Sequence, residues 1–238
     1  MSLNIEILFP EVNYLFGDGS NVRYLKNCLP DADFIEDHFN EEPFFVRNSP
    51  SLIYCGGMTE QYQEQIISQL MPWRDLLKER IREGVPMLFT SNAIELLARF
   101  IQNEDGSRVP GLDLYPFGAK RDRMNRFNCL FKGKFQDMDI IGFKTQFTFA
   151  YGKTDYRPFM QVDRGTGMNP KAAGEGIHDH NLFATYLVGP FLIMNPHFTK
   201  YFLQDVMGLD DVSLPWEDAL LDAYNERLAE FSDPETKY

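Results

Sequence analysis

Short apolar runs that alternate with helical segments constrain the fold of this chain more than any other feature. The runs span residues 4–10 (NIEILFP), 51–55 (SLIYC) and 85–90 (VPMLFT). Such short apolar runs are typical of strands buried in a sheet. Helical segments are expected between them at residues 21–29 and 59–83, with a kink at Pro72 in the longer one. This order predicts an α/β protein with a doubly wound, mainly parallel sheet.

The second half of the chain has a different pattern. Residues 126–161 alternate polar and aromatic side chains, which predicts antiparallel strands or hairpins and therefore a mixed sheet. Residues 181–187 then return as a core strand. A helix is expected over residues 195–206, because Pro196 suits the first turn of a helix.

The chain is expected to form one domain over residues 4–207, because no repeat, low-complexity tract or linker interrupts it. Residues 208–238 would form a C-terminal amphipathic helical tail. Its helix, expected at residues 217–231, has an apolar side that packs either on the domain itself or on a partner protein.

Charge and cysteine usage exclude several classes of function. Lys and Arg total 23 against 35 Asp and Glu, a net charge of -12 that disfavours nucleic acid as a partner. No run of about 18 apolar residues is present, so no membrane span is expected. Cys28, Cys55 and Cys129 are an odd number at wide spacing, typical of a reducing compartment. We therefore expect a cytoplasmic protein, and we assign it no metal and no cofactor.

Two places at the ends of predicted strands are candidates for chemistry, because ligands of open α/β sheets bind beyond the carboxyl ends of the strands. Ser91 lies where a strand passes into a helix expected over residues 93–102, which would expose its side chain at a helix N-terminus. The alternative is that Ser91 or Asn92 is only an N-cap. Gly56 and Gly57 would let backbone N–H groups approach a ligand, although a plain tight turn also explains them.

Four motifs, taken in order, resemble those of class I glutamine amidotransferases. They are Cys55-Gly56-Gly57, Gly84-Val85-Pro86, Gly165-Thr166-Gly167-Met168-Asn169 and Thr185-Tyr186-Leu187-Val188-Gly189-Pro190. The sequence is most similar to the group of cobyric acid synthase and the glutaminase subunit of lipid II isoglutaminyl synthase, where the last motif reads T-Y-L-H-G-P. The resemblance implies a flavodoxin-like three-layer α/β/α sandwich with a mixed, mainly parallel central sheet.

The resemblance also implies glutamine hydrolysis by a cysteine nucleophile and a histidine base, with ammonia passed to a synthetase. In this chain the nucleophile position is Ser91 and the base position is Val188. Other positions also depart from the family pattern; these are Asn92 and Ala93 for two glycines, Glu95 for a glutamine, and Lys144 and Gln146 for a glutamate and a histidine. Gly56, Gly57, Asn92, Glu95 and Gln146 are the candidate substrate-binding residues.

These replacements favour a protein that has lost hydrolysis. A serine hydroxyl is a poor nucleophile without a base, and the side chain at Val188 cannot accept a proton. Our leading hypothesis is a non-hydrolytic binding or regulatory subunit of a synthetase-type complex. This chain lacks the G-x-x-x-x-G-K-[ST] motif for ATP, so any ligase chemistry would belong to a different polypeptide. The resemblance implies that this partner is a synthetase or Mur-ligase-like subunit.

Two alternatives stay open at the level of sequence. The chain could be an active amidotransferase that supplies ammonia to an ATP-dependent ligase through unusual residues, with Cys55 as nucleophile or His178 or His180 as base. The old pocket could bind another small carboxylate or amine. The family's functional positions are correctly assigned to this chain only if Ser91, Val188 and the Gly56-Gly57 backbone converge on one pocket.

Overall fold

The computed structural model describes residues 3–152 and 156–236 and has a six-stranded central sheet. In spatial order its strands are β2 (Asp33–Asp37), β1 (Asn4–Leu8), β3 (Leu52–Cys55), β4 (Met87–Phe89), β14 (Leu182–Ala184) and β13 (Ile177–Asp179). Every neighbouring pair is parallel except β13 and β14, which are antiparallel. The predicted mixed, mainly parallel sheet is therefore confirmed.

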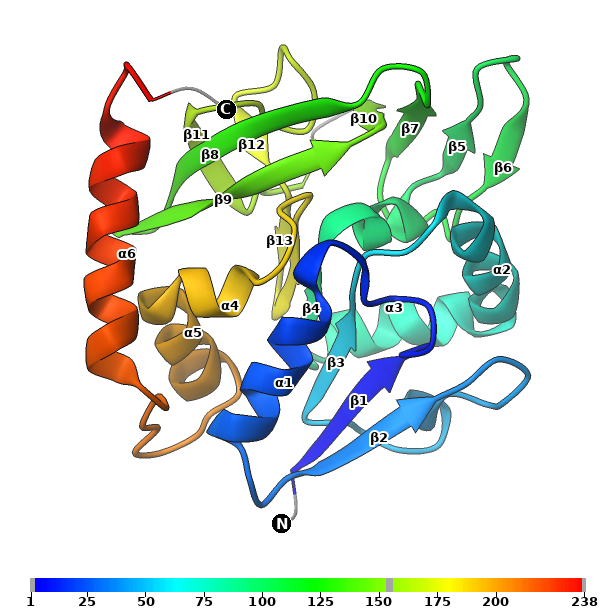
Figure 1. Cartoon of the computed structure of the whole chain (residues 1–238). Helices are drawn as coiled ribbons and strands as arrows, with labels where there is room; N and C mark the ends of the chain where they lie inside the picture. Colours follow the sequence, from blue (N-terminus) through cyan, green and yellow to red (C-terminus); the bar gives the residue numbers. More distant parts are fainter. Residues whose placement is uncertain (1–2, 153–155, 237–238) are drawn as a thin grey trace.

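Helices cover both faces of this sheet and make a three-layer sandwich (Figure 1). One face packs against α2 (Glu60–Leu70) and α3 (Arg74–Arg82), and the other packs against α1 (Gly19–Cys28), α4 (Phe191–Met194) and α5 (Pro196–Tyr201). Successive residues of a strand point to opposite faces, so Cys55 faces α2 and α3 while Tyr54 faces α1. Pro72 lies in the 3-10 turn Met71–Trp73 between α2 and α3, at the predicted kink.

The remaining strands form two four-stranded sheets beside the sandwich. One contains β10 (Thr148–Gly152), β7 (Phe117–Arg121), β5 (Phe100–Gln102) and β6 (Arg108–Pro110), and the other contains β12 (Gly174–Glu175), β11 (Met160–Arg164), β8 (Phe127–Phe135) and β9 (Met138–Gln146). The long antiparallel hairpin of β8 and β9 crosses the top of the view in Figure 1. It confirms the antiparallel strands predicted for residues 126–161.

The helix predicted over residues 93–102 is wrong beyond residue 97. A 3-10 helix, Ser91–Leu97, ends where Ala98 takes an extended conformation. Residues Phe100–Gln102 then form β5, which pairs with both β6 and β7. The ladder hydrogen bonds to the following strand β6 and to the more distant β7 override the local helical pattern.

The C-terminal helix α6 (Glu217–Ser232) packs on its own domain, along one side of the molecule (Figure 1). Its buried Tyr224 and Phe231 form a small apolar cluster with Leu130 and Ile141 of the hairpin. The domain boundary at residue 207 stays a prediction.

Other short helices are the 3-10 turns Leu15–Gly17 and Phe44–Val46 and the π-helical turn Phe202–Val206, which continues α5. None of the described helices is long and apolar enough to cross a membrane.

The hydroxyl of Tyr224 ties α6 to the hairpin, and its removal should have a measurable cost. It donates to the backbone carbonyl of Asp139 at 2.9 Å. We expect Tyr224→Phe to lower the free energy of unfolding by about 1 kcal/mol, because a part-buried acceptor loses its donor. Tyr151→Phe, on an exposed side chain, is the control. Equal urea midpoints for Tyr224→Phe and the wild type would contradict this role.

Candidate functional site

The parallel neighbours β3, β4 and β14 end at one edge of the central sheet. The residues that follow these strands continue the backbone hydrogen bonds between them. The amide of Thr90 donates to Cys55 O at 3.0 Å, and the amide of Thr185 donates to Phe89 O at 2.9 Å. One residue farther, the amide of Ser91 donates to Leu187 O at 3.1 Å. The peptide bond that precedes Val188 therefore lies against the backbone of Ser91.

Ser91 lies at the sharp turn that ends β4, as predicted. Its φ of 58° is in the left-handed region, unusual for a residue with a side chain and suited to an abrupt change of chain direction. The N-cap alternative is wrong, because Thr90 holds that position and no side chain caps the helix. A Cβ atom on Gly57 would lie 2.8 Å from Ser91 Oγ, so a glycine is required there.

Asn92 holds the glycine turn against the start of the helix. Its Oδ1 accepts from the amide of Met58 at 3.0 Å, and its Nδ2 donates to Met58 O at 2.8 Å. These two bonds fix the loop that follows Gly57. Asn92 lines the pocket, but most of its hydrogen-bonding capacity is used to position the backbone.

Asp18 was missed by the sequence analysis and lies directly behind the glycine turn. Its Oδ2 accepts from the amide of Gly57 at 2.6 Å. Burial raises the pKa of Asp18 to about 7, against the lowering effect of this hydrogen bond. The Gly57 amide, expected to approach a ligand, is thus directed at a carboxyl group of the protein.

Val188 is buried, and its amide donates to Phe143 O at 3.0 Å. Its position beside Ser91 is that expected from the motif order, but an isopropyl group can neither accept nor donate a proton. Gly56 is also tightly enclosed, since a Cβ there would lie 2.3 Å from Asn13 O.

A cavity of about 250 Å³ opens in front of Ser91. Its buried end is formed by Met58, Ser91, Glu95, Gln146, Thr148 and Tyr186, and its exposed rim includes Leu15, Phe16, Thr59 and Arg126. Asn92, Glu95 and Gln146 line it, as expected of candidate binding residues. Gly56, Gly57 and Val188 do not line this cavity, so the expected convergence of these residues with Ser91 on one pocket is not found. Of the three, Gly57 lies directly against the Ser91 side chain.

Glu95 is a buried carboxyl group at the closed end of the cavity. Its Oε2 accepts from Gln63 Nε2 at 3.0 Å, and Gln63 is itself held by Arg121, whose Nη2 donates to Gln63 Oε1 at 2.7 Å. Burial raises the pKa of Glu95 from 4.5 to about 7, while Gln63 and Arg121 lower it.

The raised pKa of Glu95 predicts a pH-dependent effect of its replacement. Between pH 4.5 and about 7 the folded chain holds a proton at Glu95 that the unfolded chain releases, so this contribution to stability is lost as pH rises through 7. Relative to the wild type, Glu95→Gln should gain at most about 1.4 kcal/mol per pH unit across this window. Urea unfolding at several pH values measures it, with exposed Glu83→Gln as control. A constant difference would contradict the prediction.

A buried ion pair holds the segment that leads from β14 to Val188. Lys144 Nζ lies 3.2 Å from Glu175 Oε1, and both side chains are 0% exposed. Glu175 also accepts from the amide of Tyr186 and from Thr185 Oγ1, each at 2.8 Å. Burial lowers the pKa of Lys144, and Glu175 opposes that shift. Lys144 therefore has a structural role behind the pocket.

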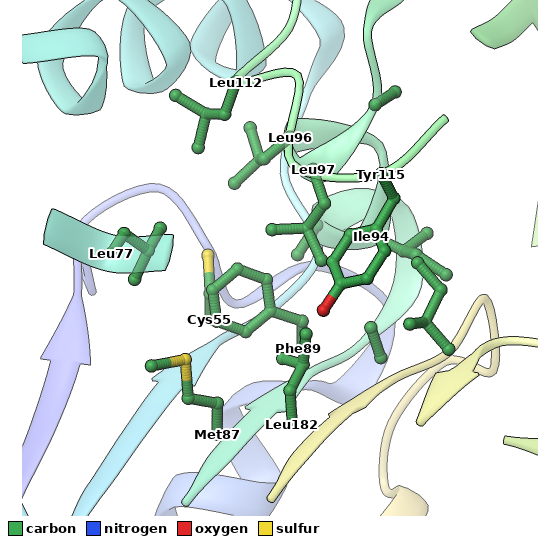
Figure 2. Close-up of a cluster of buried hydrophobic side chains, with 14 of the residues drawn as sticks. Cys55, Leu77, Met87, Phe89, Ile94, Leu96, Leu97, Leu112, Tyr115 and Leu182 are labelled. Carbon is green, nitrogen blue, oxygen red and sulfur yellow. The ribbon is translucent and has the colours of Figure 1, made fainter. Parts of the chain in front are cut away.

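Cys55 is unsuited to act as a substitute nucleophile. It is completely buried in the core between the sheet and α3, near Leu77, Met87 and Phe89 (Figure 2). Burial raises the pKa of its thiol to about 12, so the reactive thiolate is scarce at neutral pH.

The histidines also stand apart from Ser91. His178, a possible base in the alternative reading, is half-buried in β13, where its ring stacks on Phe183 at 4.4 Å. His180 is exposed and pairs with Asp179. Both line a different hollow. Within residues 3–152 and 156–236, no group of three or more His, Cys, Asp or Glu side chains could hold a metal ion.

Arg126 and Tyr186 are further pocket residues that the sequence analysis did not select. Tyr186 lies inside the T-Y-L-V-G-P string, so the motif itself could have indicated it. The guanidinium of Arg126 lies 4.6 Å from the ring centre of Phe147, and only the fold brings these two residues to the rim. Nothing in the sequence around Arg126 marks it as a binding residue.

Sequence comparisons place these residues in a family context. A profile of the CobB/CobQ-like glutamine amidotransferase domain matches residues 11–196. The chain is similar to the lipid II isoglutaminyl synthase (glutamine-hydrolyzing) subunit GatD of Streptococcus pneumoniae (strain ATCC BAA-255 / R6), with 26% identity over 249 residues, 99% of this chain and 92% of the relative. The subunit GatD of Staphylococcus aureus (strain N315) is 28% identical over 167 residues, 69% of this chain and 67% of that protein.

Solved structures agree on the fold. A glutamine amidotransferase from Thermotoga maritima superposes with a TM-score of 0.51 at 12% identity, covering 98% of this chain and 100% of that one. Another glutamine amidotransferase structure gives a TM-score of 0.52 at 13% identity, with coverage of 86% and 99%. At these identities the likeness concerns the architecture alone.

Proposed function

The chain belongs to the CobB/CobQ-like glutamine amidotransferase family, and we propose that it is a member that binds a small ligand without hydrolysing glutamine. It is similar to subunits of a lipid II isoglutaminyl synthase. In our proposal it acts as a binding or regulatory subunit of a synthetase-type complex. The ligase chemistry then belongs to a Mur-ligase-like partner.

The pairing of Ser91 with Val188 carries this proposal. The serine occupies the strained turn where a nucleophile would stand, and the residue whose backbone lies against it has no basic group. Activation of a hydroxyl requires a positioned base within hydrogen-bond reach. Two further observations support the proposal, namely the buried, protonated thiol of Cys55 and the Gly57 amide that already donates to Asp18.

The proposal is tested by purifying the chain from native cells and isolating its complex with a ligase-type protein; the absence of any such partner would contradict the subunit role. We expect the complex to form its amide product from ammonium ions but not from glutamine. Ser91→Ala should change neither result. Glutamine-dependent product formation that Ser91→Ala abolishes would instead establish the alternative, an active amidotransferase that supplies ammonia to an ATP-dependent ligase.

A further inference from the structure

Three buried polar atoms at the closed end of the cavity make no close, well-aligned hydrogen bond in the part of the chain that the structure describes, although the Tyr186 hydroxyl lies near enough to the Glu95 carboxyl to lower its pKa. They are Glu95 Oε1, Gln146 Oε1 and the hydroxyl oxygen of Tyr186. All three side chains line the cavity, and each is at least nine-tenths buried. Leaving such atoms unsatisfied costs free energy, so their gathering at one wall indicates a ligand that donates hydrogen bonds.

The neighbouring bonds fix two of these atoms, on Gln146 and Glu95, as acceptors. Gln146 Nε2 donates to Thr148 O at 2.6 Å, so its Oε1 must be the free end of the amide. Gln63 Nε2 donates to Glu95 Oε2, which leaves Glu95 Oε1 for a ligand. The buried end of the cavity therefore presents a carboxylate oxygen, an amide oxygen and a phenol hydroxyl.

The charge on Glu95 has no paired cation among the described residues. Arg121 is the cation that most influences it, but the guanidinium donates to Glu64 at 2.7 Å, to Asn103 at 2.9 Å and to Gln63 at 2.7 Å. A buried carboxylate is stabilised far more by a full positive charge than by a neutral donor. An ammonium group has three donors and one positive charge, which matches this wall.

The rim carries the opposite charge. Arg126 forms no ion pair within residues 3–152 and 156–236, and its guanidinium stacks over the ring of Phe147 at 4.6 Å. Such an arginine suits a carboxylate held at the mouth of the cavity. Glu60 also lines the cavity and could accept from an α-amino group.

We propose that the cavity binds an amino acid with a terminal primary amine, such as ornithine or lysine, with the side-chain ammonium at Glu95, Gln146 and Tyr186 and the α-carboxylate at Arg126. A volume of about 250 Å³ suits a molecule of this size. The proposal rests on the proposed function in one respect, namely that the pocket retains its ligand instead of hydrolysing it.

Isothermal titration calorimetry on the full chain tests this assignment with L-ornithine, L-lysine, L-glutamine and L-norleucine. Ornithine or lysine should bind roughly tenfold to a hundredfold more tightly than glutamine or norleucine, because only the first two carry the terminal ammonium. Glu95→Gln should remove that preference without weakening norleucine. Arg126→Gln should weaken all four amino acids, and Glu83→Gln, far from the pocket, should weaken none.

Several results would overturn the proposal. Glutamine binding as tightly as ornithine and lysine would do so, as would a preference for the amines that survives Glu95→Gln, or no binding of either amine to the wild type. The wild-type ligand series does not depend on whether a variant folds, and thermal melting checks each variant. Ammonia release from glutamine, measured separately, reports on the proposed function alone.

Discussion

Ammonia release from glutamine by the unmodified protein is expected to lie about 10⁶-fold below that of an active enzyme of this class. Both members of the proton relay are replaced, since Ser91 stands at the nucleophile position and Val188 at the base position. Because a nucleophile and its base act as a unit, losing both costs about as much as losing either. A coupled ammonia assay over hours, on the chain alone and with its partner, gives the measurement.

Ser91→Ala is the internal control for this assay. If residual release is unrelated to the pocket, the variant and the wild type should give the same low rate. Robust release that survives Ser91→Ala would reveal another nucleophile. Robust release that the variant abolishes would show that the serine is activated after all, and either result ends the non-hydrolytic proposal.

The double variant Ser91→Cys with Val188→His tests the physical reason for the loss. It should release ammonia faster than the product of the two single effects predicts, because neither group works without the other. The amide of Ser91 already bonds to Leu187 O, so a histidine at the next residue starts from a backbone placed beside the nucleophile. The unmodified protein remains the decisive sample, since Glu95 and Asn92 also alter the pocket.

The strands that could be predicted from sequence are those whose residues are buried along the whole length of the strand. The strands β3 and β4 are buried on both faces and read as continuous apolar runs, and β1 is buried in the same way although Glu6 interrupts its apolar run. Strand β2 (DFIED) was missed, because an edge strand with acidic ends carries no such run. The error at β5 has a related cause, since its strand conformation depends on pairing with β7, seventeen residues later at Phe117, and not on its own pattern.

The residues of the site also fall into those that sequence could place and those that it could not. The motif order predicted that Ser91, Val188 and the glycine turn lie at one edge of the sheet, because the ends of adjacent parallel strands must meet there, but of these residues only Ser91 lines the cavity. Asp18 could not be found, because its bond to the Gly57 amide joins residues 39 positions apart and no motif marks it. Nor could sequence show that the side-chain amide of Asn92 is hydrogen-bonded to the Met58 backbone, since that follows only from side-chain geometry.

Replacing Lys144 by methionine is expected to lower the free energy of unfolding by about 3–5 kcal/mol, a large part of the 5–15 kcal/mol of a typical domain. Its partner Glu175 would remain as a buried charge without a cation, 0% exposed. The methionine also cannot donate to Gly167 O, which Lys144 Nζ bonds at 2.8 Å. Chemical denaturation of the variant and the wild type measures the loss.

The matched control is Lys134→Met, on the other strand of the same hairpin. Lys134 pairs with Asp139 at 2.9 Å, but its side chain is 45% exposed, so water replaces the lost partner and the cost should stay below about 1 kcal/mol. Adding Glu175→Gln to Lys144→Met should recover part of the stability, because it removes the stranded charge. Because Glu175 also holds the amide of Tyr186, the single variant should loosen the pocket wall as well. If Lys144→Met cost no more than Lys134→Met, the buried pair would not be what fixes this wall.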